Sequence, residues 1–208
     1  MTAAASSAGT MRLLLTGAIG LVVLPFALRA IGLTLDNAIV LVILCMATMG
    51  LNLLVGYTGL VSFGASAWFG IGGYAAAISQ LHWFRGQFVA PVAFSVAFTA
   101  ALALVVGFLI LRRRGVYFSL LTLALCALTF AIAFRWTSLT GGEGGLGGIQ
   151  RGKLGPVDLD DDVAYYAMTA TVAFAVLYAL LRVVRSPFGH VLVAIRENEQ
   201  RARFVGYP

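Results

Sequence analysis

Charged residues are scarce in this sequence of 208 residues, since Asp, Glu, Lys and Arg together make up only 11% of it. Soluble domains carry about 25% charged residues, whereas 61% of this chain is hydrophobic. This shortage excludes an ordinary soluble domain and predicts a membrane protein that crosses the bilayer several times. The formal net charge of +6 follows membrane topology, so we expect no nucleic-acid partner.

Cysteine and histidine are also rare, with two of each in the whole chain. Cys45 and Cys126 lie inside apolar runs, which argues against a disulfide framework or a metal site. His82 and His190 are far apart and lack neighbours of the kind that ligate metals. We therefore expect no catalytic residues, no metal and no cofactor bound by this chain.

Long apolar runs fill most of the sequence. A hydrocarbon core of ~30 Å requires about 20 apolar residues per helix, so the chain has room for six spans. The predicted fold is all-α, with an N-terminal tail over residues 1–12, a membrane domain over 13–181 and a cytoplasmic segment over 182–208. The spans are expected at about 13–35, 37–54, 60–81, 88–111, 116–134 and 163–181.

The first apolar run has a second interpretation as a cleaved signal peptide. Arg12 precedes the apolar core, and the segment 27–30 (ALRA) loosely matches a cleavage site. The run is longer than a usual signal core, and Arg29 is unfavourable at such a site. We favour a retained membrane helix.

A glycine-rich stretch follows the second span. The segment 56–59 (GYTG) should break the helix, and non-helical backbone at membrane depth survives only inside protein or beside water. Beyond it, Ser62, Ser66 and Gly70 recur every four residues and predict one small, partly polar face. Such a face suits close helix packing or a transport path, and the break and the face together favour the path. The candidate path residues are Asn52, Gly56, Thr58, Gly59, Ser62, Ser66, Gly70 and Tyr74.

The distribution of charge predicts the orientation. If the N-terminus is inside, the inner segments hold nine arginines and two glutamates, a net charge of +7, and the outer segments have a net charge of −1. Basic residues are enriched on the cytoplasmic side of membrane proteins. The inner residues are Arg12, Arg112, Arg113, Arg114, Arg182, Arg185, Arg196, Glu197, Glu199, Arg201 and Arg203.

The last stretch, RVVRSPFGHVLVAIRENEQRARFVGYP (182–208), is too charged to enter a bilayer. Ser186 can cap a helix, and Pro187 suits the first helical position. Glu197 with Arg201, and Glu199 with Arg203, are pairs four residues apart that support an exposed helix. Gly206 lies where such a helix would stop. We expect a helix at the membrane surface that contacts either a partner or anionic lipid.

Three segments of the sequence resemble one family. The sequences SPFGHVLVAIRENEQRARFVG, LNLLVGYTGLVSFGASAWFGIGGYAAA and, more weakly, RRRGVYFSLLTLAL with LTGGEGGLGGI occur in family order. They resemble the branched-chain amino-acid permeases of ABC importers and cover about two thirds of the chain. The resemblance implies that the last stretch is the cytoplasmic coupling helix, with ATPase-coupling residues Ser186, Pro187, Phe188, Gly189, Arg196, Glu197, Asn198, Glu199 and Gly206.

The resemblance also implies the partners and the location. A permease of this family is a multi-pass protein of the bacterial inner membrane and works with a second permease subunit, as a heterodimer or homodimer. Two cytoplasmic ATPases bind ATP and Mg²⁺, and a substrate-binding protein outside delivers the amino acid. Family members usually continue with further membrane helices, so we expect this chain, which stops at Pro208, to be C-terminally truncated.

Other functions remain open. Related permeases carry urea or short amides, and a secondary transporter or channel would need no ATPase. We find no second broken span to match 56–59 and no ionisable residue clearly at mid-membrane, both of which a secondary transporter would favour. A scaffold or assembly protein would not need the charge pattern of 196–203.

The loop before the last span contains two weak motifs. Gly142, Gly144 and Gly147 fit G-x-G-x-x-G, but no strand precedes them and no Gly-Lys-Ser/Thr follows, so nucleotide binding is not expected. The acidic cluster 158–162 lacks the spacing of a cation site. Together with Glu143, these acids form either a solvated outer edge or a surface that steers a binding protein.

Overall fold

The computed structural model describes residues 2–112, 115–154 and 157–204, and most of these residues are helical. The predicted all-α membrane fold is confirmed. The chain forms two compact units, residues 1–59 with 161–208 (unit 1) and residues 60–160 (unit 2), and each is described by itself. The predictions for Arg113, Arg114 and Gly206 fall outside the described residues.

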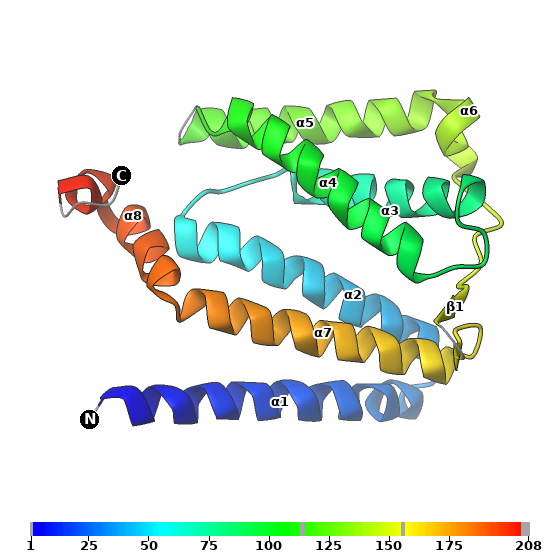
Figure 1. The fold of residues 1–208 in the computed structure, drawn as a ribbon, viewed down its shortest axis with the longest axis horizontal. Coiled ribbons are helices and arrows are strands. Elements are labelled where there is room, and N and C mark those ends of the chain that lie inside the picture. The colour runs from blue at the N-terminus through cyan, green and yellow to red at the C-terminus, as the bar shows by residue number, and fades with distance from the viewer. Residues whose placement is uncertain (1, 113–114, 155–156, 205–208) are drawn as a thin grey trace. The chain divides into compact units, whose positions relative to one another are not determined.

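Unit 1 contains four helices and one π-helical turn. They are α1 (Thr2–Ala30), α2 (Leu35–Asn52), the π-helical turn η1 (Leu53–Tyr57), α7 (Asp162–Val184) and α8 (Pro187–Phe204). Helices α2 and α7 run in parallel, with α1 packed antiparallel to both (Figure 1). The core of this unit consists of Ala38, Ile39, Val42, Tyr166 and Ala173.

Unit 2 contains three long helices and the loop that follows them. They are α3 (Ala65–His82), α4 (Val89–Ile110) and α5 (Val116–Arg135), followed by α6 (Thr137–Thr140), a 3-10 turn η2 (Gly142–Gly144), and the strands β1 (Lys153–Leu154) and β2 (Val157–Asp158). The two strands pair antiparallel. The Ser95 hydroxyl on α4 donates to the carbonyl oxygen of Gly72 on α3 at 2.6 Å, which ties these two helices together.

Five helices of the described chain are long and apolar enough to cross a membrane, whereas the sequence predicted six spans. The five cover residues 9–30, 35–57, 89–110, 116–135 and 162–184. The exception is α3, which begins at Ala65 rather than at residue 60 and carries glycines, serines, Gln80 and His82 in its 18 residues. A helix of this composition is suited to burial by other helices rather than to direct exposure to lipid.

Two helix bounds differ from the prediction in unit 1. The predicted tail is helical, because α1 begins at Thr2. The second span, expected to end at residue 54, continues through η1 to Tyr57. Glycine at position 56 is compatible with the helical backbone, and the chain leaves the helix only at Gly59, whose φ is +72°.

Candidate coupling helix and transport cavity

Helix α8 begins at Pro187, where the sequence predicted a helix start. The Ser186 hydroxyl accepts a hydrogen bond from the backbone N–H of Gly189 at 3.4 Å and donates to the carbonyl oxygen of Val183 at 2.6 Å. Gly189 is buried, and a Cβ at this position would lie 2.1 Å from the carbonyl oxygen of Val184. The first turn of α8 therefore packs directly on the backbone end of α7, and only glycine fits there.

Phe188 lies in the same turn and has the opposite environment. Its side chain is 60% exposed. Pro187 and Gly189, on either side of it, lie in the first turn of the helix and hold its backbone in place. Exposed aromatic side chains held on a rigid turn are typical anchors of protein interfaces. The position of Phe188 thus suits contact with another molecule.

The predicted single coupling helix is in fact two helical segments. Asn198 has φ −161° and ψ 101°, which is extended backbone, and its side-chain oxygen accepts a hydrogen bond from the N–H of Arg201 at 2.9 Å. Asn198 is therefore the N-cap of a second short segment. The prediction of a Glu197–Arg201 pair across one helix turn is wrong, because the kink changes their spacing and no ion pair joins these two described side chains. The Glu199 and Arg203 side chains lie outside the described part of the structure.

The predicted helix break lies at the end of η1. A Cβ at Gly56 would lie 2.7 Å from the side-chain oxygen of Asn52, so this amide covers the glycine. The Thr58 hydroxyl donates to the carbonyl oxygen of Leu54 at 2.5 Å. Four predicted path residues, Asn52, Gly56, Thr58 and Gly59, thus close the end of one helix, and a π-helical turn at such a position is often functional.

Arg196 joins α8 to this break. Its guanidinium donates a hydrogen bond to the carbonyl oxygen of Gly56, one of the carbonyls that a helix end leaves without a helical partner. A Cβ at Gly59 would lie 2.7 Å from Cγ of Arg196, so the side chain lies against the glycine at the break. The sequence placed Arg196 among the coupling residues and Gly56 and Gly59 among the path residues, and the structure brings these two groups into direct contact within unit 1.

The segment from Leu60 to Gly64 in unit 2 is non-helical, so Ser62 does not share a helical face with Ser66 and Gly70. Ser62 Oγ instead accepts the N–H of Gly64 at 3.2 Å. Helix α5 supplies the other partners of this segment: Ser119 donates to the carbonyl of Val61 at 2.7 Å, and Thr122 accepts from the N–H of Phe63 at 3.1 Å.

Ser119 and Thr122 hold this segment through their hydroxyls, and sequence reasoning missed them. Backbone outside a helix must find partners within the protein at membrane depth, and these two hydroxyls provide them. A Cβ at Gly64 would lie only 3.0 Å from the carbonyl oxygen of Thr122, so the lack of a side chain at this position allows the segment to approach α5 closely. The only signal in the sequence is a pair of hydroxyl residues three apart in an apolar run.

Ser66, Gly70 and Tyr74 line one cavity of about 510 Å³ in unit 2, together with residues of α5. The Ser66 hydroxyl lies 3.1 Å from Sγ of Cys126 across the cavity wall. Ile71, Phe130 and Phe134 belong to its apolar lining, and Thr129 and Glu143 add polar groups. Three of the predicted path residues therefore line a cavity of the size that small ligands occupy, ~300–1,000 Å³.

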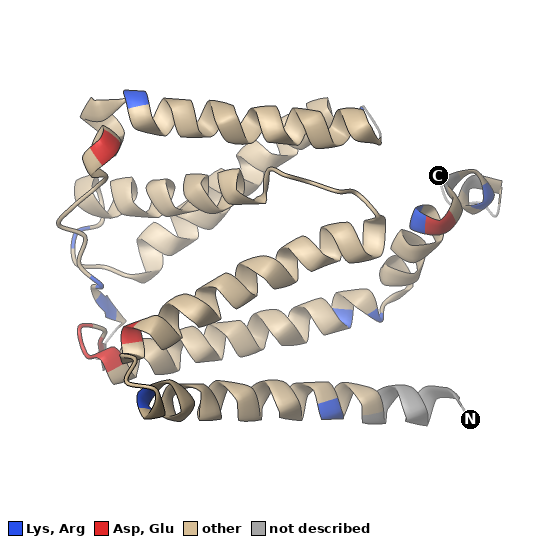
Figure 2. Cartoon of the chain, turned by 180° about the vertical axis from the view of Figure 1, so that it is seen from behind, with Lys and Arg blue, Asp and Glu red and all other residues tan. Residues whose placement is uncertain are grey.

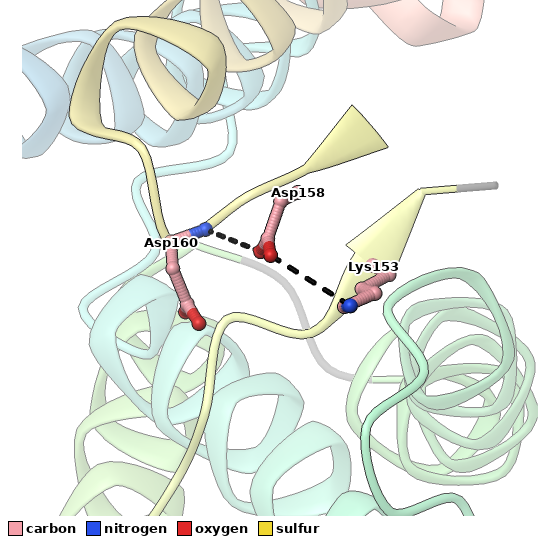
Figure 3. A network of polar contacts seen from close by, with 3 residues as sticks. All are labelled: Lys153, Asp158 and Asp160. Atoms are coloured by element: carbon pink, nitrogen blue, oxygen red, sulfur yellow. Dashed lines mark hydrogen bonds and ion pairs between the residues drawn. The ribbon is translucent and has the colours of Figure 1, made fainter. Parts of the chain in front are cut away.

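The acids that the sequence predicted to lie outside have local roles that it did not indicate. The Asp158 carboxylate forms an ion pair with Lys153 at 3.8 Å and accepts the N–H of Asp160 at 3.2 Å (Figure 3). The Asp161 carboxylate caps α7 by accepting the N–H groups of Val163 and Ala164. Part of the acidic cluster therefore stabilises this turn and the start of a helix.

In unit 1 the acidic residues other than those of α8 lie at the ends of α2 and α7 that are remote from α8 (Figure 2). Acidic residues in the first turn of a helix are favourable because of the positive end of the helix dipole. Asp36 and Asp162 occupy this position in α2 and α7. The two ends of these helices thus differ in charge, as expected of helices that cross a membrane.

These features define a multi-pass α-helical membrane protein with a broken helix end, a surface helix joined to that end and a lined cavity. A family model described as "Branched-chain amino acid transport system / permease component" matches residues 33–208, and the chain belongs to this family. The match includes α2 to α8 and all of the candidate site residues.

Two curated relatives share this similarity. The chain is 26% identical over 197 residues to the high-affinity branched-chain amino acid transport system permease protein LivM of Escherichia coli (strain K12). It is 24% identical over 196 residues to the protein of the same name of Salmonella typhimurium (strain LT2). Each alignment covers 83% of this chain and 46% of the relative, so the chain spans about half the length of the curated relatives it matches. No solved structure matches the chain.

Proposed function

We propose that this chain acts as the transmembrane permease subunit of an ABC importer for branched-chain amino acids. In this proposal it lies in the bacterial inner membrane with its N-terminus in the cytoplasm and pairs with a second permease subunit. Two cytoplasmic ATPases bind ATP and Mg²⁺, a binding protein outside delivers the substrate, and this chain carries no cofactor of its own. Family membership and the names of both relatives support the proposal.

The observation that carries the proposal is the contact between Arg196 and the carbonyl of Gly56. A coupling helix must pass the movement of an ATPase to the membrane helices. Arg196 is the point at which α8 holds the end of the α2–η1 span, and Gly59 gives the side chain the space it needs. A displacement of α8 would therefore take the Arg196 hydrogen-bond donor away from the Gly56 carbonyl at the end of η1. Its effect would not be limited to the surface of the protein.

The first turn of α8 suits contact with an ATPase. Phe188 is exposed for insertion into a cleft, while Gly189 and Ser186 fix this turn to the end of α7. A push on Phe188 would thus move the end of α7 directly, and it would move the helix break at residues 56–59 through Arg196. ATP-driven closure would favour one of two arrangements of these contacts, which is the requirement for alternating access.

The proposal is tested by leucine uptake in proteoliposomes that contain this chain with candidate ATPase, permease and binding-protein subunits encoded in the same genome. Phe188→Ala should abolish ATP-driven uptake and substrate-stimulated ATP hydrolysis, because truncation of an interface anchor costs roughly 2 kcal/mol or more. Phe204→Ala is the matched control, since Phe204 is 90% exposed on the second segment of α8. It should leave both activities near the wild-type level.

The controls separate the alternatives. Membrane insertion of both variants must be equal, as judged by the yield of monodisperse protein. Leucine uptake that proceeds without ATP and without the ATPases would overturn the proposal in favour of a secondary transporter. Uptake of urea or short amides in place of leucine would correct the substrate but retain the class.

A further inference from the structure

The loop between α5 and β1 has a backbone conformation that residues other than glycine rarely adopt. Gly141, Gly142 and Gly145 have φ of +76°, +60° and +65°. A Cβ at Gly141 would lie 2.0 Å from the carbonyl oxygen of Gly145, and a Cβ at Gly142 would lie 2.8 Å from Cγ2 of Thr137. The loop is therefore folded tightly on itself and on the end of α5, and this conformation fixes the position of the one acidic residue that it carries, Glu143.

The loop also has a hydroxyl at its base. The buried Thr140 hydroxyl donates to the carbonyl of Ala133 at 2.6 Å and accepts the N–H of Gly142 at 3.3 Å. This bond network ties the start of the loop to the last turns of α5, whose residues Phe130 and Phe134 line the cavity. Glu143 and Gly142 line the same cavity.

The Glu143 carboxylate has no hydrogen bond or ion pair within the described residues, in contrast to Asp158 and Asp161. It shares the lining of the cavity with the apolar side chains of Ile71 and Phe130 and with two hydroxyl residues, Tyr74 and Thr129. The Thr129 hydroxyl donates to carbonyls of its own helix at 3.0 and 2.9 Å, so only its lone pairs remain for a ligand. The cavity thus combines a carboxylate, hydrogen-bond acceptors and an apolar wall.

We propose that this cavity binds the α-amino acid itself, with the Glu143 carboxylate accepting hydrogen bonds from the substrate ammonium group. The branched side chain contacts Ile71 and Phe130, and the Tyr74 hydroxyl, which has no partner in the described structure, donates to the substrate carboxylate. The inference rests on the proposed function, because it names the residues that would hold the substrate of that function.

The physical reason is the selectivity of charge-assisted hydrogen bonds. An ammonium group pairs with a carboxylate at short distance and with roughly twice the strength of a neutral pair. Glu143 is exposed in the free chain, and a bound amino acid whose side chain lies on the apolar wall would exclude part of the water around this pair and strengthen it. A branched-chain amino acid supplies both the ammonium group for the carboxylate and an apolar side chain for the wall. A neutral amide or urea leaves the carboxylate without a positive partner.

The chain contains its own probe for this site. Cys126 lines the cavity, and Cys45 lies exposed on α2 in unit 1. The purified full chain is alkylated with N-ethylmaleimide, with and without L-leucine, and labelling of each cysteine is followed by peptide mass spectrometry. Leucine should slow the alkylation of Cys126 several-fold and leave that of Cys45 unchanged. N-acetyl-leucine, which lacks the ammonium group, should give no protection of Cys126.

Variants then assign the protection to Glu143. With Glu143→Gln, the leucine concentration that gives half-protection should rise roughly tenfold or more, the effect of losing a hydrogen bond to a charged group. Asp160→Asn removes an exposed acid outside the cavity. In this variant the leucine concentration that gives half-protection of Cys126 should equal that of the wild type. Protection is compared with the unprotected rate of the same variant, so a change in thiol reactivity does not affect the result.

Two outcomes overturn the inference. The first is equal slowing of Cys126 by leucine and by N-acetyl-leucine, and the second is an unchanged half-protection concentration in Glu143→Gln. Wild-type uptake by Glu143→Gln in the proteoliposome assay would likewise place the substrate elsewhere, while the permease function would stand. Absence of ATP-driven uptake by the wild-type assembly, with Cys126 protection retained, would instead overturn the importer proposal and leave the binding site.

Discussion

The Tyr166 hydroxyl on α7 donates a 2.5 Å hydrogen bond to the carbonyl oxygen of Leu21 on α1. Leu21 lies four residues before Pro25, and proline has no N–H to offer that carbonyl. Within a bilayer there is no water to replace the missing bond. Tyr166 thus satisfies the carbonyl that Pro25 leaves without a partner, and it anchors α1 in unit 1.

Replacement of Tyr166 by Phe should destabilise the protein, because the Leu21 carbonyl loses its donor. Hydrogen bonds between membrane helices average ~0.6 kcal/mol and reach ~1.7 kcal/mol, and we expect the upper part of this range. The measurement is the free energy of unfolding in bicelles. In a Pro25→Ala background the helix itself supplies the donor, so the cost of Tyr166→Phe should shrink. An equal cost in both backgrounds would contradict this explanation.

Replacement of Arg196 by Ala should uncouple the ATPases from transport. The Gly56 carbonyl loses its partner, and the end of η1 is no longer held by α8. We expect faster amide hydrogen exchange in residues 53–59 and the loss of substrate-stimulated ATP hydrolysis. Arg201→Ala removes the same charge from the exposed second segment of α8 and serves as the control. If exchange in residues 53–59 stayed as slow as in the wild type, the contact would not hold the break.

Gly189→Ala should be among the most harmful small substitutions in the chain. The added Cβ would overlap the carbonyl oxygen of Val184, so α8 must move away from α7. Overpacking of this kind costs ~1–3 kcal/mol, measurable as a lower free energy of unfolding. Gly50→Ala in α2 is the matched control, because a Cβ there meets nothing within 4 Å. It should be neutral or stabilise the helix by ~0.5–1 kcal/mol.

The double substitution Ser119→Ala with Thr122→Val should release the non-helical segment 60–64. Its backbone groups at Val61 and Phe63 then lose their side-chain partners. Hydrogen exchange of the Phe63 amide should accelerate strongly while that of α5 remains slow. Thr48→Val is the control, because the Thr48 hydroxyl bonds only within its own helix. Unchanged exchange at Phe63 would show that other groups satisfy this segment.

The orientation can be tested with single cysteines in a chain without Cys45 and Cys126. An impermeant maleimide added to intact cells should label Asp160→Cys, which lies in the segment predicted to be outside. It should label Arg201→Cys only after the cells are opened, because basic residues concentrate inside. Both positions are exposed. Labelling of Arg201→Cys alone in intact cells would reverse the topology.

Much of the fold could be predicted from the sequence, because helices in a bilayer need long apolar runs. The runs at 88–111, 116–134 and 163–181 match α4, α5 and α7 to within a few residues. Pro187 and Gly59 marked a helix start and a helix break because both act through the local backbone. Such features depend on neighbours in sequence and are therefore readable without a structure.

The remaining features depend on contacts between distant residues. Nothing around Arg196 indicates that its guanidinium reaches Gly56, 140 residues earlier in the sequence. Ser62 seemed to continue the spacing of Ser66 and Gly70, but the hydrogen bonds from Ser119 and Thr122 hold its segment out of the helix. Glu143 was grouped with the outer acids because charge alone is visible in sequence, whereas the glycine conformations that place it at the cavity are not.

The glycine loop that carries Glu143 also has an entropic consequence. Glycine loses more conformational freedom on ordering than any other residue, and each ordered residue costs ~1–2 kcal/mol of backbone entropy. Five glycines of this loop, Gly141, Gly142, Gly145, Gly148 and Gly152, have positive φ. The entropic free-energy cost of keeping this loop ordered therefore grows as the temperature rises, while the helices beside it remain folded. Warming should release Glu143 from the cavity before the helices unfold, so the affinity for substrate would fall with a large apparent enthalpy.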